Sequence, residues 1–141
     1  MLIVTKNEKI SLSSENETEE LANIISKKIK FGDIIYLHGE MGVGKTTFIK
    51  YFINSFQKKN KLKQTEVTSP TFNILIEYQI NQKMISHYDL FRLKSSDELK
   101  NLNLFENKSN TITLIEWPQI INEKPNNLIE IFFEYEDDYQ N

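Results

Sequence analysis

Apolar residues recur along the chain with two different periods, which predict strands and helices in alternation. The run Ile34–Leu37 is uniformly apolar, as in a strand that is buried on both faces. Between Thr47 and Phe56 the apolar residues instead recur every three or four positions, which predicts an amphipathic helix. Four later runs predict further strands: 73–78, 83–89, 111–115 and 128–135. This order indicates an α/β fold with a mostly parallel central sheet flanked by helices.

The N-terminal part adds a predicted hairpin and a predicted helix. Two short strands are expected at 2–5 and 10–12. A helix is expected from Glu15 to about Lys30, because acids fill its first turn and lysines its last. Gly32 closes that segment before the next strand. The apolar face of this helix is expected to hold Leu21, Ile24, Ile25 and Ile29.

Turn and cap residues mark two further features. The pair Asn81-Gln82 separates two predicted strands and so predicts a hairpin turn. Ser95 precedes two acids and is expected to cap a short helix over 96–103.

The segment between the first buried strand and the amphipathic helix has the phosphate-binding pattern G-x-x-x-x-G-K-[ST]. It consists of Gly39, Glu40, Met41, Gly42, Val43, Gly44, Lys45, Thr46 and Thr47. Three of the four glycines in the chain fall here, where the backbone must approach phosphate without a Cβ in the way. Backbone N–H groups of such a loop, together with a helix N-terminus, bind phosphate. Lys45 is predicted to reach the β and γ phosphates, and Thr46 to offer its hydroxyl to Mg²⁺.

Two acidic residues end predicted strands and are candidates for catalysis and metal binding. Asp89 follows one strand and Glu116 another, and the carboxyl ends of parallel strands lie at the edge where α/β proteins bind ligands. Asp89 is interpreted as a contact to Mg²⁺. Glu116 could hold Mg²⁺, orient the attacking water or pair with Arg92. His87 shares a strand face with Asp89 by the period of two, as either a structural or a functional histidine.

Trp117, the only tryptophan, follows Glu116 and precedes Pro118. A residue before proline favours an extended backbone, so Trp117 is predicted to be extended and to point to the side of the strand opposite Glu116.

Composition limits the classes of function. At 141 residues and 16.7 kDa, the chain is expected to form a single domain, 1–141. The absence of cysteine excludes disulfides and thiol catalysis, and a net charge of −3 argues against a chain that grips DNA or RNA by itself. The basic run Lys58–Lys63 is interpreted as a helix end and loop. No apolar run predicts a membrane span or a signal peptide, so a cytoplasmic protein is expected.

The phosphate loop and three later segments together resemble the TsaE (YjeE) family of small bacterial ATPases. The later segments are Thr68–Phe72, His87–Leu93 and Ile115–Pro118. The resemblance implies a P-loop ATPase that uses ATP and Mg²⁺ in making threonylcarbamoyladenosine beside the anticodon of certain tRNAs. It also implies TsaD and TsaB proteins as partners, through which tRNA is reached indirectly. We expect ATP hydrolysis to be slow without these partners.

The resemblance also implies roles for individual residues. Thr46 and Glu116 would contact Mg²⁺, and Asp89 would be the Walker B acid. The Ser69–Phe72 loop, which includes Thr71, resembles a switch that senses the γ phosphate. Glu15 matches a segment that lies near the nucleotide in the family.

The chain also departs from the family pattern in two places. Asn103 stands where the family commonly has glycine, and asparagine tolerates the left-handed backbone that such a turn needs. The Gly-Arg that often follows the last strand in the family is absent.

Two other classes of function remain open from the sequence. A reduced P-loop nucleotide or small-molecule kinase is one, although the single arginine, Arg92, can hardly furnish the arginine-bearing lid of such enzymes. The other is an ATP-gated binding module in which hydrolysis is incidental. The guanine-reading motif Asn-Lys-x-Asp is absent, which weakens a GTPase interpretation.

Overall fold

The computed structural model describes residues 2–4, 9–11, 14–40, 44–70, 72–106 and 108–134. Seven strands form one sheet in the order β2-β1-β7-β3-β6-β5-β4. Their bounds are β1 Leu2–Val4, β2 Lys9–Ser11, β3 Ile34–His38, β4 Leu75–Ile80, β5 Lys83–Asp89, β6 Thr111–Glu116 and β7 Leu128–Glu134. The four strands from β7 to β5 run parallel, and β1, β2 and β4 add antiparallel edges. The predicted α/β fold with a largely parallel centre is confirmed.

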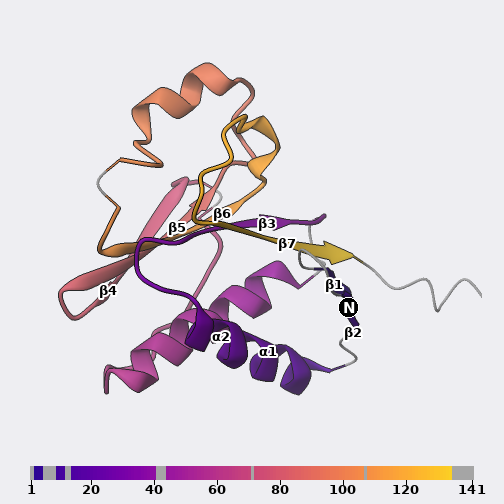
Figure 1. Ribbon diagram of the computed structural model, residues 1–141, viewed down its shortest axis with the longest axis vertical. Helices are drawn as coiled ribbons and strands as arrows, with labels where there is room; N and C mark the ends of the chain where they lie inside the picture. The colour runs from indigo at the N-terminus through magenta and orange to yellow at the C-terminus, as the bar shows by residue number, and fades with distance from the viewer. Residues whose placement is uncertain are drawn as a thin grey trace, which may run out of the picture.

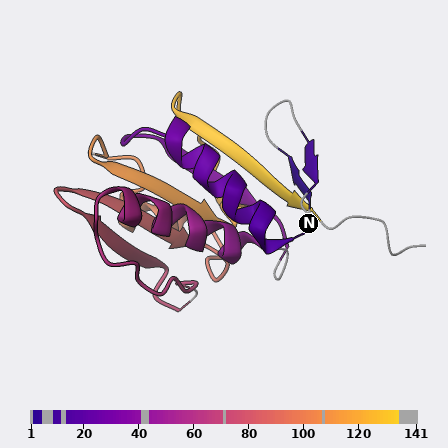
Figure 2. The same ribbon diagram turned by 90° about the horizontal axis from the view of Figure 1, so that it is seen from below.

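Both α-helices lie on the same face of this sheet. Figure 1 shows α1 (Glu15–Lys28) and α2 (Lys45–Lys59) below the strands, and Figure 2, seen from below, shows the two helices side by side in front of the sheet. Two 3₁₀ helices, η1 (Ser96–Asn101) and η2 (Pro118–Ile120), lie on the opposite face with their loops. The sheet is therefore flanked by helices as predicted, with the α-helices confined to one side within the described residues.

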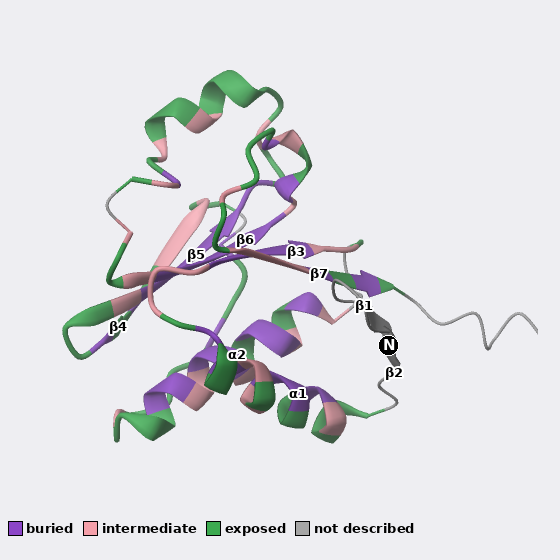
Figure 3. Ribbon diagram, in the orientation of Figure 1, coloured by how far each residue is buried: buried purple, intermediate pink, exposed green. Residues whose placement is uncertain are grey.

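The strand period of two divides the core between these faces. On β3, Ile35 and Leu37 belong to the core between the sheet and the helices α1 and α2, whereas Ile34 and Tyr36 pack on the side of η1 and η2. Buried residues run through the central strands and line the sheet-facing sides of the two α-helices (Figure 3). The apolar face predicted for α2 is confirmed, since all five of its members are buried: Phe48, Ile49, Phe52, Ile53 and Phe56.

Small residues hold the two α-helices together and correct the predicted face of α1. The hydroxyl groups of Ser26 and Ser55 are 3.0 Å apart, so the helices approach closely at these positions. Ala22 and Ser26 are buried, while Ile24 is 49% exposed. The assignment of Ile24 to the buried face was wrong, because the polar residue Ser26, which an apolarity pattern overlooks, is turned toward α2 instead.

Several element boundaries also differ from the prediction. The helix α1 ends at Lys28, because Ile29 turns to an extended backbone and is buried in the core. The strand β4 begins at Leu75, since Ile74 has a φ of 70° and donates its N–H to the Pro70 carbonyl. The short helix predicted over 96–103 is the 3₁₀ helix η1, which ends at Asn101; Ser95 is its N-cap residue but makes no side-chain cap hydrogen bond.

Predicted turn chemistry is confirmed at three places. Asn81 has a φ of 57° in the turn between β4 and β5, and Asn103 has a φ of 51°, as expected of asparagine in a left-handed turn. The end of α2 carries Lys58 and Lys59 in its last turn, as predicted for the basic run.

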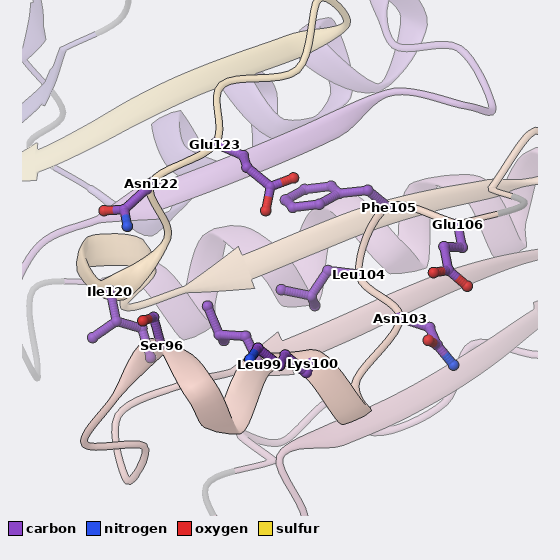
Figure 4. A pocket seen from close by; sticks show the side chains of 10 residues that line it. All are labelled: Ser96, Leu99, Lys100, Asn103, Leu104, Phe105, Glu106, Ile120, Asn122 and Glu123. Carbon is purple, nitrogen blue, oxygen red and sulfur yellow. The ribbon is translucent and has the colours of Figure 1, made fainter.

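A pocket of about 410 Å³ lies on the face of the sheet opposite α1 and α2. Figure 4 shows Leu99 of η1, Leu104 and Ile120 of η2 around it, with Glu123 close to the ring of Phe105. The hydroxyl of Tyr36 anchors one wall by donating to the Glu123 carbonyl at 2.9 Å. Burial, together with the charges of Glu123 and Glu130, raises the pKa of Tyr36 to about 12, so this hydroxyl stays protonated.

Candidate functional site

The carboxyl ends of β3, β6 and β5 bring the phosphate loop and the two acids to one edge of the sheet. Glu116 pairs in register with Leu37 on one side and with Asp89 on the other. The loop begins at Gly39, directly after β3 ends at His38. Three segments far apart in the sequence therefore meet here, as expected of parallel strands.

The period of two turns the polar side chains of these strands toward α2. Ile85 of β5 and Leu114 of β6 pack in the core between the sheet and the α-helices. Residues two positions further along share that face, so His87 and Asp89 of β5 and Glu116 of β6 lie on it as well. The sheet places these three side chains on the side where α2 begins.

The helix α2 begins with a glycine. Gly44 is its N-cap with a φ of 104°, a conformation that favours glycine, and it supplies no side-chain cap. Gly39 also has a positive φ, of 149°. The predicted nucleotide contacts Met41, Gly42, Val43 and Thr71 lie outside the described residues.

Lys45 is buried at the centre of the site, with 4% of its side chain exposed. Its ammonium donates to the Gly39 carbonyl, lies 3.9 Å from Glu116 Oε1 and sits 4.0 Å from the centre of the Trp117 ring. Burial lowers the pKa of Lys45, while the charges of Glu116 and Asp89 act in the opposite direction. The cation is thus held inside the protein by an acid, a carbonyl and an aromatic face.

Asp89 links the sheet to the two loops beside it. Its Oδ1 accepts from the Phe91 N–H at 3.0 Å, and its Oδ2 accepts from the Ser69 hydroxyl at 2.8 Å. The side chain is almost fully buried. The segment with the predicted switch, Ser69–Phe72, is therefore tied directly to the acid predicted to contact Mg²⁺.

Glu116 contacts His87 and Lys45 rather than Arg92. Its Oε2 lies 2.7 Å from His87 Nε2. Arg92 is exposed, with its guanidinium 5.3 Å from the ring centre of Phe72. Of the roles predicted for Glu116, pairing with Arg92 is excluded by this geometry.

The prediction that Trp117 has an extended backbone was wrong. Its φ of 57° and ψ of 56° are left-handed, although the following proline favours an extended backbone. The indole does not point away from the site, since it covers the Lys45 ammonium and contacts Phe91, with ring centres 4.9 Å apart. These contacts offset a backbone conformation that costs about 1–3 kcal/mol.

The other predicted site residues are spread around this centre. Thr46 and Thr47 follow Lys45 in the first turn of α2, with Thr46 exposed, and Glu40 is exposed beside Gly39. Glu15 stands apart at the start of α1. Burial, then the charge of Glu15, raises the pKa of Tyr51. The structure brings together Lys45, Asp89 and Glu116, and leaves Glu15 outside that contact network.

The side chains at this edge suit Mg²⁺, which takes several of its ligands from water and phosphate, better than a metal that is bound by protein groups alone. Within the described parts of the chain, no group of three His, Asp or Glu side chains could hold a metal ion. Mg²⁺ is usually bound by one or two carboxylates together with waters and substrate phosphates. The two carboxylates Asp89 and Glu116, in register at one edge of the sheet, fit that pattern.

Comparison with known proteins assigns the chain to a family. Residues 12–141 match the family model described as "Threonylcarbamoyl adenosine biosynthesis protein TsaE". The chain belongs to the TsaE family. The TsaE protein of Rickettsia bellii is 41% identical over 133 residues, which cover 94% of this chain and 90% of that protein.

Other relatives of the TsaE family are matched over less of their length. The TsaE protein of Rickettsia conorii is 41% identical over 111 residues, 79% of this chain, but the match spans only 61% of that protein. Among solved structures, YdiB of Bacillus subtilis has a TM-score of 0.61 and 26% identity, with 97% of this chain and 82% of that chain covered. None of the described helices is long and apolar enough to cross a membrane.

Two contacts of the site were not predicted from the sequence. The link from Ser69 to Asp89 joins residues 20 positions apart, and no periodicity signals it. The position of Trp117 over Lys45 depends on a left-handed backbone that the following proline disfavours. The one available signal was the pair Trp117-Pro118 after Glu116, which belongs to a segment that resembles the family.

Proposed function

We propose that this chain is a Mg²⁺-dependent ATPase that supports the formation of threonylcarbamoyladenosine in tRNA. The observation that carries the proposal is the convergence of buried Lys45, Asp89 and Glu116 at the loop edge of the sheet. Its membership of the TsaE family and the names of its relatives, tRNA threonylcarbamoyladenosine biosynthesis proteins, support the wider role. The partners would be TsaD- and TsaB-like proteins, and the activity would belong to the cytoplasm.

In this proposal the residues divide the work of phosphoryl transfer to water. The loop N–H groups and Lys45 bind the β and γ phosphates. Mg²⁺, held by Thr46 with Asp89 or Glu116, would neutralise charge on the phosphates. In this proposal one carboxylate also orients the attacking water, which would be the role of Glu116 if Asp89 serves the metal. Water attack gives ADP and inorganic phosphate.

The site also offers a way to report the γ phosphate to a partner. The Ser69 hydroxyl binds Asp89, and Phe72 in the same loop is 82% exposed, beside Arg92. Rearrangement of Asp89 around Mg²⁺ would be transmitted to this loop and its exposed aromatic ring. The same contacts favour an ATP-gated binding module as the second candidate, in which the loop responds to ATP without meaningful turnover.

Product analysis tests the proposal. Purified chain is incubated with Mg²⁺ and γ-labelled ATP, alone and with purified TsaD and TsaB proteins. We expect ADP and free phosphate, formed slowly by the chain alone and faster with the partners. Label transferred to another small molecule would support a kinase instead, and ATP-dependent complex formation without turnover would support the gated module.

A further inference from the structure

His87 occupies a buried position where an apolar residue would fit. It has 0% exposure and pairs in register with Leu114 on one neighbouring strand and Ile76 on the other. Its Nε2 lies 2.7 Å from Glu116 Oε2. Its Nδ1 is buried without a hydrogen-bond partner among the residues that the structure describes. A leucine would fill this space without stranding a polar atom, so packing alone does not explain the histidine.

The contact with Glu116 determines which ring nitrogen carries the proton. An ionised carboxylate only accepts hydrogen bonds, so Nε2 must be the donor. The Nε2–H group of His87 is therefore aimed at Glu116 Oε2, at 2.7 Å.

This hydrogen bond controls how the Glu116 carboxylate faces the phosphate loop. The last torsion of a glutamate side chain is broad, so an unrestrained carboxylate samples many orientations. With Oε2 held by His87, the other oxygen, Oε1, is left on the side of Lys45, 3.9 Å from the ammonium. Oε1, the oxygen on the side of Lys45 and the loop, is thus the one that would meet a metal or a water there.

We propose that His87 is a positioning residue that orients Glu116 for its work on Mg²⁺ or the attacking water. The inference rests on the proposed ATPase, because Glu116 must act at the nucleotide for its orientation to matter. Some residues hydrogen-bond a metal ligand and fix its orientation without touching the metal themselves. Removing such a residue lowers metal affinity or activity on the order of 10- to 100-fold.

Three substitutions separate orientation from packing. His87→Gln keeps an amide N–H at nearly the reach of Nε2, His87→Leu fills the space without a donor, and His87→Asn keeps an amide that is too short to reach Glu116. We expect His87→Leu and His87→Asn to lower kcat, and the affinity of the chain for Mg²⁺ in the presence of ADP, by roughly 10- to 100-fold. His87→Gln should restore most of both. ADP affinity without Mg²⁺, measured by calorimetry, should match the wild type in all three.

The Glu116→Gln background supplies the decisive control. If His87 acts through Glu116, His87→Leu should lower kcat and Mg²⁺ affinity no further in that background. Wild-type Mg²⁺ affinity in His87→Leu, or equal losses in the Gln and Leu variants, would overturn the proposal. If His87→Leu does not fold, the comparison of His87→Gln with His87→Asn tests the proposal instead. Mg²⁺ affinity is measured without turnover, so the test stands even if the chain proves not to hydrolyse ATP.

Discussion

Replacing Trp117 by leucine should tighten nucleotide binding, although the residue lies in the site. The Lys45 ammonium sits 4.0 Å from the ring centre, within the range of a cation–π interaction. To reach the β and γ phosphates, this ammonium must leave the ring. The aromatic face therefore competes with the nucleotide for Lys45.

The size of the effect follows from the burial of the pair. Lys45 has 4% of its side chain exposed, so the interaction is largely desolvated and is worth roughly 0.5–2 kcal/mol. Removing that competition should lower the Kd for ATP or ADP by about 2- to 30-fold. Trp117→Phe keeps a weaker aromatic face and should fall between the leucine variant and the wild type.

Calorimetric titration with ADP, with and without Mg²⁺, measures this change directly. Phe132→Leu is the matched control, because Phe132 is also a partly exposed aromatic residue but stacks on His38 rather than on Lys45. Its Kd should equal that of the wild type. Weaker binding by Trp117→Leu would refute the reasoning and would indicate that the indole contacts the nucleotide itself.

Three further predictions concern the site, and a fourth concerns the turn at Asn103. Lys45→Ala should abolish measurable ATP binding in calorimetry, since no other described cation lies in the loop; unchanged affinity would remove the phosphate-site assignment. Asp89→Asn and Glu116→Gln should lower the rate of hydrolysis more than ADP affinity, and equal losses would point to a folding defect instead. Adding ADP to the wild type should change Trp117 fluorescence in a saturable way as Lys45 leaves the ring, with no such change in Lys45→Ala. Asn103→Ala should lower the free energy of unfolding by about 1 kcal/mol because of the positive φ, while Asn103→Gly should not, as thermal melts would show.

The sequence was most informative where local pattern and topology agree. The strand β3, the glycine loop and α2 follow one another along the chain, so periodicity and loop composition were enough to predict them. Asp89 and Glu116 could be placed together because parallel strands present their carboxyl ends at one edge, and the register Asp89↔Glu116 confirms this.

Prediction failed where tertiary contacts override local preference. Trp117 adopts a left-handed backbone before a proline because its ring packs on Lys45 and Phe91, which are distant in the sequence. Ile24 is exposed, whereas the polar residue Ser26 is buried with its hydroxyl 3.0 Å from that of Ser55 on α2, a contact that the hydrophobic pattern does not register. Contacts between residues far apart in sequence leave no periodic trace.

The position of β3 in the sheet has a consequence for how the protein comes to be made. Ile34 pairs with Thr113 on one side and with Leu128 on the other, so both neighbours of this strand come from the C-terminal part of the chain. During synthesis, the glycine loop and α2 emerge from the ribosome well before the strands that hold them in place. Pairings of such large sequence separation form slowly. The strand that leads into the glycine loop therefore lacks both of its sheet neighbours until the C-terminal part of the chain has been made.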